Sequence, residues 1–86
     1  MPANGLSSTE HLGLLYREHH SWLLGWLRKR VACRFLAEDH AHDAFLRVIA
    51  TRDVHTIREP RAYLTTIAHG LIINHRRRAA IERAYW

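Results

Sequence analysis

Three apolar stretches with helical spacing constrain the fold of this chain more than any other feature. In each stretch, hydrophobic side chains recur at intervals of three and four, which places them on one face of an α-helix. The stretches cover residues 9–30, 34–50 and 60–84, and residues 51–59 form a polar connection. The expected fold is all-α, a compact bundle of three main helices after a flexible N-terminus (residues 1–8), with no strands.

Each helix is expected to turn one stripe of side chains toward a shared core. The stripes are Leu12, Leu15, Tyr16, Trp22, Leu23, Trp26 and Leu27; then Ala37, His40 or Ala41, Ala44, Phe45 and Val48; then Tyr63, Leu64, Ile67, Ala68, Leu71 and Ile72. Ser7 and Glu10 predict a capping box for the first helix. Pro60 suits the first position of the third helix. Gly25, inside the first helix, predicts a close contact with another helix.

Size and composition predict one small folded domain. The chain has 86 residues, of which 48% are hydrophobic, and its apolar runs are too short to cross a membrane. Residues 1–8 lack the basic and apolar segments of a signal peptide, so a cytoplasmic location is expected. The single cysteine, Cys33, excludes an internal disulfide and is expected to be inert near a helix end.

The basic excess lies in the last third of the chain. Residues 1–59 contain eight Lys/Arg and seven Asp/Glu, whereas residues 60–86 contain five Arg and one Glu. Arginine forms forked contacts with phosphates and base edges. A polyanion is therefore the expected partner, with nucleic acid preferred over a membrane surface, and a basic face that serves only solubility is the alternative.

Catalytic and metal-binding motifs are not found in the sequence. The eight histidines include His40 and His42, which a helix points to different sides, and no Cys-x-x-Cys, His-Glu-x-x-His or acidic calcium loop is present. The glycines are isolated, and no motif brings Ser, His and Asp together as a nucleophilic triad. Neither an enzyme nor a metal or other cofactor is expected.

One face of the second helix carries two acidic residues beside an apolar one. Asp39, His42, Asp43 and Leu46 follow the spacing i, i+3, i+4 and i+7, so they share one exposed face. The spacing is compatible with a solvated face and with a compact contact surface.

Several segments resemble the extracytoplasmic-function class of bacterial sigma factors. Residues 37–48 (AEDHAHDAFLRV) are similar to region 2.2 of sigma factors, and residues 57–68 (IREPRAYLTTIA) and 71–78 (LIINHRRR) resemble regions 2.3 and 2.4. Residues 15–23 (LYREHHSWL) and 81–85 (IERAY) look like the iron-starvation, ferric-citrate-type subgroup, which serves siderophore uptake. The resemblance covers about residues 12–85.

The resemblance implies that the second helix binds core RNA polymerase. In the family this helix docks on the clamp helices, a coiled coil of the β′ subunit, and the matching positions are Asp39, His42, Asp43 and Leu46. Carboxylates can accept charge-assisted hydrogen bonds from arginines of the partner. Two residues depart from the family pattern, which commonly has leucine at His40 and glutamine at His42.

The resemblance also implies that the connection and the third helix recognise and melt the −10 promoter element. In the family, the non-template strand is captured single-stranded, with one base flipped into a protein pocket. The positions expected to face DNA are Arg58, Arg61, His69, Asn74, Arg76, Arg77 and Arg78. Thr66 and Ile67 stand near the aromatic pair that melts DNA in housekeeping sigma factors, so melting should depend on base capture.

The same resemblance raises two further expectations. No residues remain for the second helical domain of these factors (region 4), so the chain is expected to be a fragment or a short relative that binds polymerase weakly and does not direct transcription alone. The cytoplasmic domain of a membrane-anchored anti-sigma regulator is expected as another partner. The alternatives are a protein-interaction module without DNA function and a DNA-binding helical domain outside the sigma family.

Overall fold

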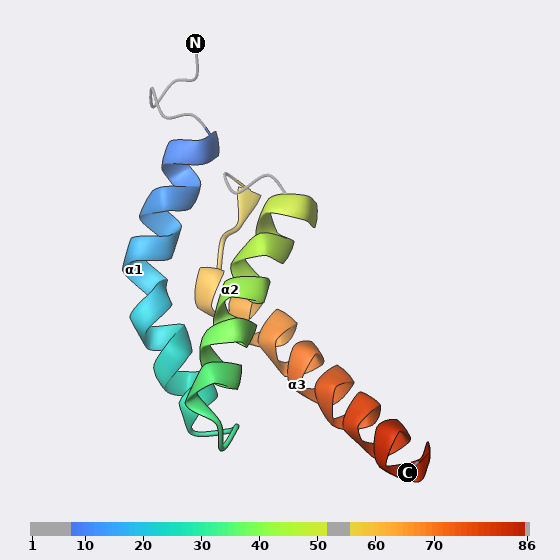
Figure 1. Cartoon of the computed structure of the whole chain (residues 1–86). Coiled ribbons are helices and arrows are strands. Elements are labelled where there is room, and N and C mark those ends of the chain that lie inside the picture. The colour runs from blue at the N-terminus through green and yellow to red at the C-terminus, as the bar shows by residue number, and fades with distance from the viewer. Residues whose placement is uncertain (1–7, 52–55, 86) are drawn as a thin grey trace.

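Three helices make up the described part of the protein, which in this computed structural model comprises residues 8–51 and 56–85. They are α1 (Ser8–Arg28), α2 (Arg34–Thr51) and α3 (Pro60–Tyr85). α1 and α2 run antiparallel, the first half of α3 packs against both, and its second half projects away (Figure 1). The prediction of an all-α fold with three helices is confirmed. No helix in the described ranges is long and apolar enough to cross a membrane.

α1 ends at Arg28, two residues before the predicted end. The carbonyl oxygen of Leu27 accepts hydrogen bonds from the backbone N–H groups of both Arg30 and Val31, each at 2.9 Å. This tight turn takes the chain out of the helix. The Arg30 guanidinium then folds back, lying 3.8 Å from the centre of the Trp26 ring and donating to the Trp26 carbonyl at 2.8 Å. A basic side chain thus satisfies one of the free carbonyl groups at the helix end.

At the starts of α2 and α3, the carbonyl group of the residue before the helix accepts the first helical hydrogen bond. Ala37 N–H donates to the Cys33 carbonyl at 3.0 Å, and Tyr63 N–H donates to the Glu59 carbonyl at 3.0 Å. Cys33 and Glu59 therefore precede the first helical residues, and Pro60 occupies the first position of α3, where its missing N–H has no cost. The capping box predicted with Ser7 lies outside the described residues.

The core lies where the three helices meet. Its buried hydrophobic residues are Leu15, Leu23 and Leu27 from α1; Ala37, Ala41, Ala44, Phe45 and Val48 from α2; and Leu64, Ala68, Leu71 and Ile72 from α3. Small alanines on α2 face larger leucines on its neighbours, which allows the close packing expected of a protein interior. All described α3 residues beyond Ile72 are exposed or only half-buried, because this half of the helix projects beyond α1 and α2 (Figure 1).

The predicted core position of Tyr16 is wrong. Its side chain is 40% exposed. The ring stacks on His20 with centroids 4.5 Å apart and lies 4.9 Å from the Phe45 ring. Tyr16 therefore covers the edge of the α1–α2 contact and leaves one side open to solvent.

The close helix contact predicted at Gly25 is also absent. Gly25 is exposed, and a Cβ atom built there would meet nothing within 4 Å. The glycine therefore lowers helix propensity with no packing gain. Gly25→Ala is expected to raise the free energy of unfolding by about 0.5–1 kcal/mol. Urea unfolding of both proteins checks this, and an unchanged or lowered midpoint would contradict it.

Candidate polymerase and nucleic-acid interfaces

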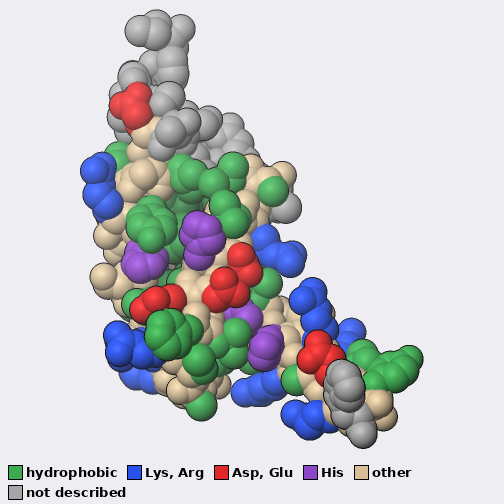
Figure 2. Space-filling view, viewed as in Figure 1, with side chains coloured by type: hydrophobic (Ala, Val, Ile, Leu, Met, Phe, Trp, Pro, Cys, Tyr) green, Lys and Arg blue, Asp and Glu red, His purple; other side chains and the backbone are tan. Residues whose placement is uncertain are grey.

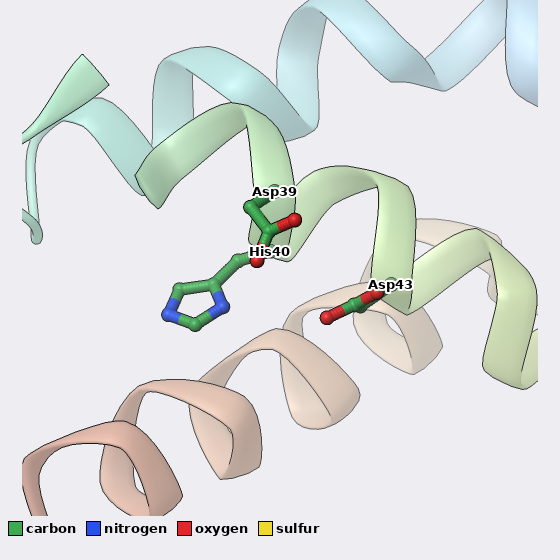
Figure 3. Close-up of side chains that lie close together, drawn as sticks. All are labelled: Asp39, His40 and Asp43. Atoms are coloured by element: carbon green, nitrogen blue, oxygen red, sulfur yellow. The ribbon is translucent and has the colours of Figure 1, made fainter. Parts of the chain in front are cut away.

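The four α2 residues expected to bind polymerase share one surface of the helix. Asp39 and Asp43 are one turn apart, and both lie close to His40 (Figure 3). His42 and Leu46 are also one turn apart, at the edge that borders α1. Leu46 is 47% exposed. In the described part of the chain, neither aspartate has an ion-pair partner, so both carboxylates are available to a partner protein.

An apolar groove continues this surface onto α1. It has a volume of about 470 Å³ and is lined by Leu12, Gly13, Tyr16, Arg17, His42, Phe45, Leu46 and Ile49. Leu12, Tyr16 and Ile49 were not among the residues predicted for this surface. The available signal was Ile49, an apolar residue outside the predicted inward stripe. An acidic edge beside an apolar groove offers a partner protein both charged contacts and apolar area.

Among the α2 residues whose burial is described, His40 is the one buried polar residue. It is 5% exposed, and neither ring nitrogen has a hydrogen-bond partner in the described part of the chain. Burial lowers the pKa of His40, the nearby His75 lowers it further, and Asp39 and Asp43 oppose the shift. The ring is therefore neutral at pH 7. A buried polar group without a hydrogen bond lowers the free energy of unfolding by about 1–3 kcal/mol. His40 therefore destabilises the fold relative to an apolar side chain of similar size.

A pocket opens where the connection enters α3. It has a volume of about 530 Å³, within the range of small-molecule sites, and is lined by Thr56, Ile57, Arg58, Glu59, Ala62, Tyr63, Thr66 and Ile67. Arg58 contributes a positive charge, and the half-buried Tyr63 contributes an aromatic ring. The Thr66 hydroxyl donates to the Ala62 carbonyl of its own helix at 2.9 Å. Tyr63 was predicted to face the core, and its place in this pocket was not predicted.

The helical period separates the basic residues of α3 into two groups. With 3.6 residues per turn, Asn74, Arg77 and Arg78 lie on the side of α3 that carries Tyr63. Asn74 lines a second hollow with Tyr63 and Thr66, which extends this side from the pocket along the helix. One surface of α3 therefore carries the pocket, Asn74, Arg77 and Arg78. This surface is called the pocket face.

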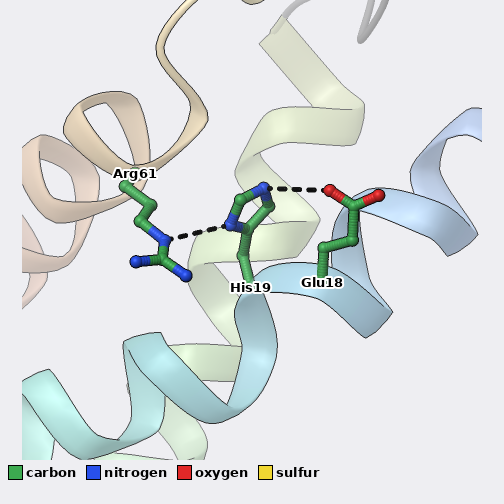
Figure 4. Close-up of polar contacts among 3 residues, drawn as sticks. All are labelled: Glu18, His19 and Arg61. Atoms are coloured by element: carbon green, nitrogen blue, oxygen red, sulfur yellow. Dashed lines mark hydrogen bonds and ion pairs between the residues drawn. The ribbon is translucent and has the colours of Figure 1, made fainter.

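Arg61 belongs to the opposite side of α3, where it contacts α1. Its Nε donates to Nδ1 of His19 at 3.3 Å, and His19 Nε2 lies 3.7 Å from Oε2 of Glu18 (Figure 4). An imidazole protonated on Nε2 makes both contacts. The Arg61 guanidinium also lies 4.8 Å from the centre of the Trp22 ring. This arginine, although exposed, fastens the start of α3 to α1.

Arg76 and His69 also lie away from the pocket face. An Nη of Arg76 donates to the backbone carbonyl of Arg30 at 3.5 Å, next to the end of α1. His69 is exposed on the same side of α3. The seven residues expected to face DNA are therefore all exposed, but only Arg58, Asn74, Arg77 and Arg78 share the pocket face.

Charge is segregated between the two surfaces. Figure 2 shows mainly blue side chains along the projecting half of α3, with red among them, and red side chains over α2. Three consecutive arginines, Arg76, Arg77 and Arg78, account for much of the positive region. The protein thus presents one surface suited to a basic partner and another suited to a polyanion.

Most of the chain is similar to known proteins. The family described as Sigma-70 region 2 matches residues 15–81. The chain is 45% identical over 71 residues to the ferric citrate uptake sigma factor FecI of Escherichia coli (strain K12), a match that covers 83% of this chain and 41% of that protein. The chain thus spans about two-fifths of the length of this curated relative. No solved structure matches the chain significantly.

Proposed function

Because this chain belongs to the Sigma-70 region 2 family, as an extracytoplasmic-function sigma factor region of the ferric-citrate type, we propose that it binds core RNA polymerase and recognises and melts the −10 promoter element. The observation that carries this proposal is the separation of an acidic, apolar surface on α2 from the basic pocket face of α3. A sigma factor needs two such surfaces, one for the enzyme and one for DNA. The genes served are proposed to be those of iron uptake, by similarity to the ferric citrate relative.

Polymerase binding is assigned to α2. Asp39 and Asp43 offer carboxylates for arginines of the β′ clamp helices, and charge-assisted pairs of this kind are among the stronger hydrogen bonds. His42 and Leu46 extend the contact to the apolar groove, where a nonpolar side chain of the partner can be buried. The anti-sigma regulator is proposed as a further protein partner.

DNA binding is assigned to the pocket face. The pocket at the start of α3 has room for one flipped base, and the Tyr63 ring supplies a stacking surface. Arg77 and Arg78 supply phosphate contacts, and Asn74 supplies a donor and an acceptor for a base edge. Thr66 and Ile67 both line the pocket, which supports capture of a base in place of an aromatic wedge.

The test is selection of single-stranded DNA by the purified chain from a pool with randomised central positions. We expect enrichment of a common sequence. Arg77→Ala/Arg78→Ala should weaken binding of all strands and reduce the slope of log affinity against log salt by about 1.4, since each phosphate contact on a single strand contributes about 0.7. Arg83→Ala, on the opposite side of the same helix, is the control for a general loss of charge.

Tyr63 separates base capture from phosphate binding. Tyr63→Ala should lower affinity for the selected sequence by the stacking energy of a base, about 1–3 kcal/mol, with a smaller effect on unselected strands. Tyr63→Phe should retain the preference because it keeps the ring. Circular dichroism confirms that each variant folds. Binding with no salt dependence and no selected sequence would instead favour the protein-interaction module.

A further inference from the structure

Asp39 and Asp43, the two carboxylates assigned to polymerase binding, converge with His40 on α2. One carboxylate oxygen each from Asp39 and Asp43 and one ring nitrogen of His40 all lie within 4.8 Å of one another (Figure 3). Asp39 is exposed, Asp43 is half-buried and His40 is buried. The cluster therefore has a protected donor at one end and access from solvent at the other.

His40 is the part of the cluster that points to a ligand. Its side chain is more than nine-tenths buried, and both ring nitrogens lack a hydrogen-bond partner among the residues that the structure describes. Buried polar atoms of this kind are rare in folded proteins, and a bound ion is one of the recognised reasons for them. A leucine would fill the same space with no unpaired atom. The neutral imidazole instead keeps a nitrogen lone pair beside two carboxylates.

The donor set selects the class of ion. Calcium and magnesium prefer shells made only of oxygen, whereas imidazole combined with carboxylate suits zinc, cobalt and similar transition metals. Donors about 2.0–2.2 Å from a tetrahedral zinc ion lie about 3.3–3.6 Å from one another. The three donor atoms lie within 4.8 Å of one another, so a bound ion would draw them closer together. Remaining positions are open to water or to His75 of α3, whose ring lies 5.8 Å from that of His40.

We propose that Asp39, His40 and Asp43 form a binding site for a divalent transition-metal ion of the Zn²⁺ or Co²⁺ class. The spacing of the histidines in the sequence did not indicate this group, in which one histidine is combined with two aspartates. Metal binding by the free domain does not rest on the proposed function. Under that function, the ion and polymerase use the same two carboxylates, so they exclude one another.

The experiment is titration of the purified full chain with Co²⁺, followed by visible absorption, with Zn²⁺ as competitor. One tightly bound Co²⁺ per chain is expected. His40→Leu should weaken this binding at least about a hundredfold, because it removes the buried donor. The matched control is His42→Leu, the same substitution two residues away at an exposed position, which should retain binding.

A second variant tests the site independently, in case His40→Leu does not fold. Asp39→Asn/Asp43→Asn keeps the shape of the side chains and His40 but removes both charges, and it should also lose tight binding. Equal affinity of wild type and His40→Leu would overturn the proposal. So would an equal loss in His42→Leu, which would mean that surface histidines hold an adventitious ion only. Because the assay contains neither DNA nor polymerase, its failure leaves the proposed function unaffected.

Discussion

Asp39→Arg/Asp43→Arg abolishes saturable binding of the domain to a purified β′ clamp-helix fragment; this is the largest effect on binding that we expect. Both carboxylates lack ion-pair partners within the described structure, so the substitutions break no described salt bridge. In the complex, they replace attraction to basic residues of the partner by repulsion. Like charges at an interface cost several kcal/mol, which corresponds to a loss of at least about a hundredfold in affinity.

A control must separate this local effect from the change in net charge. Glu18→Arg/Glu82→Arg alters the net charge by the same amount at exposed positions on α1 and α3, away from the α2 surface. It should bind almost as well as wild type, with an affinity checked at several salt concentrations. Both double variants should show the helical circular dichroism of wild type. Unchanged binding by the folded Asp39→Arg/Asp43→Arg variant would remove α2 as the docking surface.

Leu23→Ala has the largest expected effect on stability. Leu23 is 0% exposed and is among the largest fully buried side chains. Substitutions of this type cost about 2–5 kcal/mol, because they lose transfer free energy and leave a cavity. A chain of 86 residues has a total stability of about 4–13 kcal/mol at usual values per residue. The variant should therefore lose a large part of its free energy of unfolding. Its Tm should fall by about 4–8 °C for each kcal/mol lost.

Leu46→Ala provides a matched comparison for the same change of side chain. Leu46 is 47% exposed on α2, so the truncation removes little buried area and should leave Tm nearly unchanged. It should nevertheless weaken binding to the clamp-helix fragment, since Leu46 lines the apolar groove. Thermal melts of both variants decide the stability prediction. A small shift for Leu23→Ala would mean that the three helices pack differently from the structure described above.

Much of the fold follows from local patterns that need no tertiary information. The three stripes at helical spacing predict the helices, and Pro60 predicts the start of α3, because a helix period and a missing N–H are properties of the chain itself. The buried sets on α2 and α3 also agree with the predicted stripes, Tyr63 and Ile67 being half-buried. Local patterns failed where a residue's environment is set by another helix. A Cβ atom at Gly25 would meet no described atom of another helix within 4 Å, and Tyr16 lies at an open edge, although both have the local pattern of contact positions.

Tertiary packing decides which polar residues share an exposed surface, even more than it decides which residues are buried. Adjacent arginines look equivalent in the sequence, yet Arg76 reaches the end of α1 while Arg77 lies on the pocket face. Arg61 meets His19, a residue 42 positions earlier, only because α3 crosses α1 at that point. The sequence by itself determined that this protein has three amphipathic helices with an acidic α2 face and a basic α3. The tertiary structure decided which polar groups meet and that His40 is buried beside two carboxylates, because such contacts depend on how helices distant in sequence pack together.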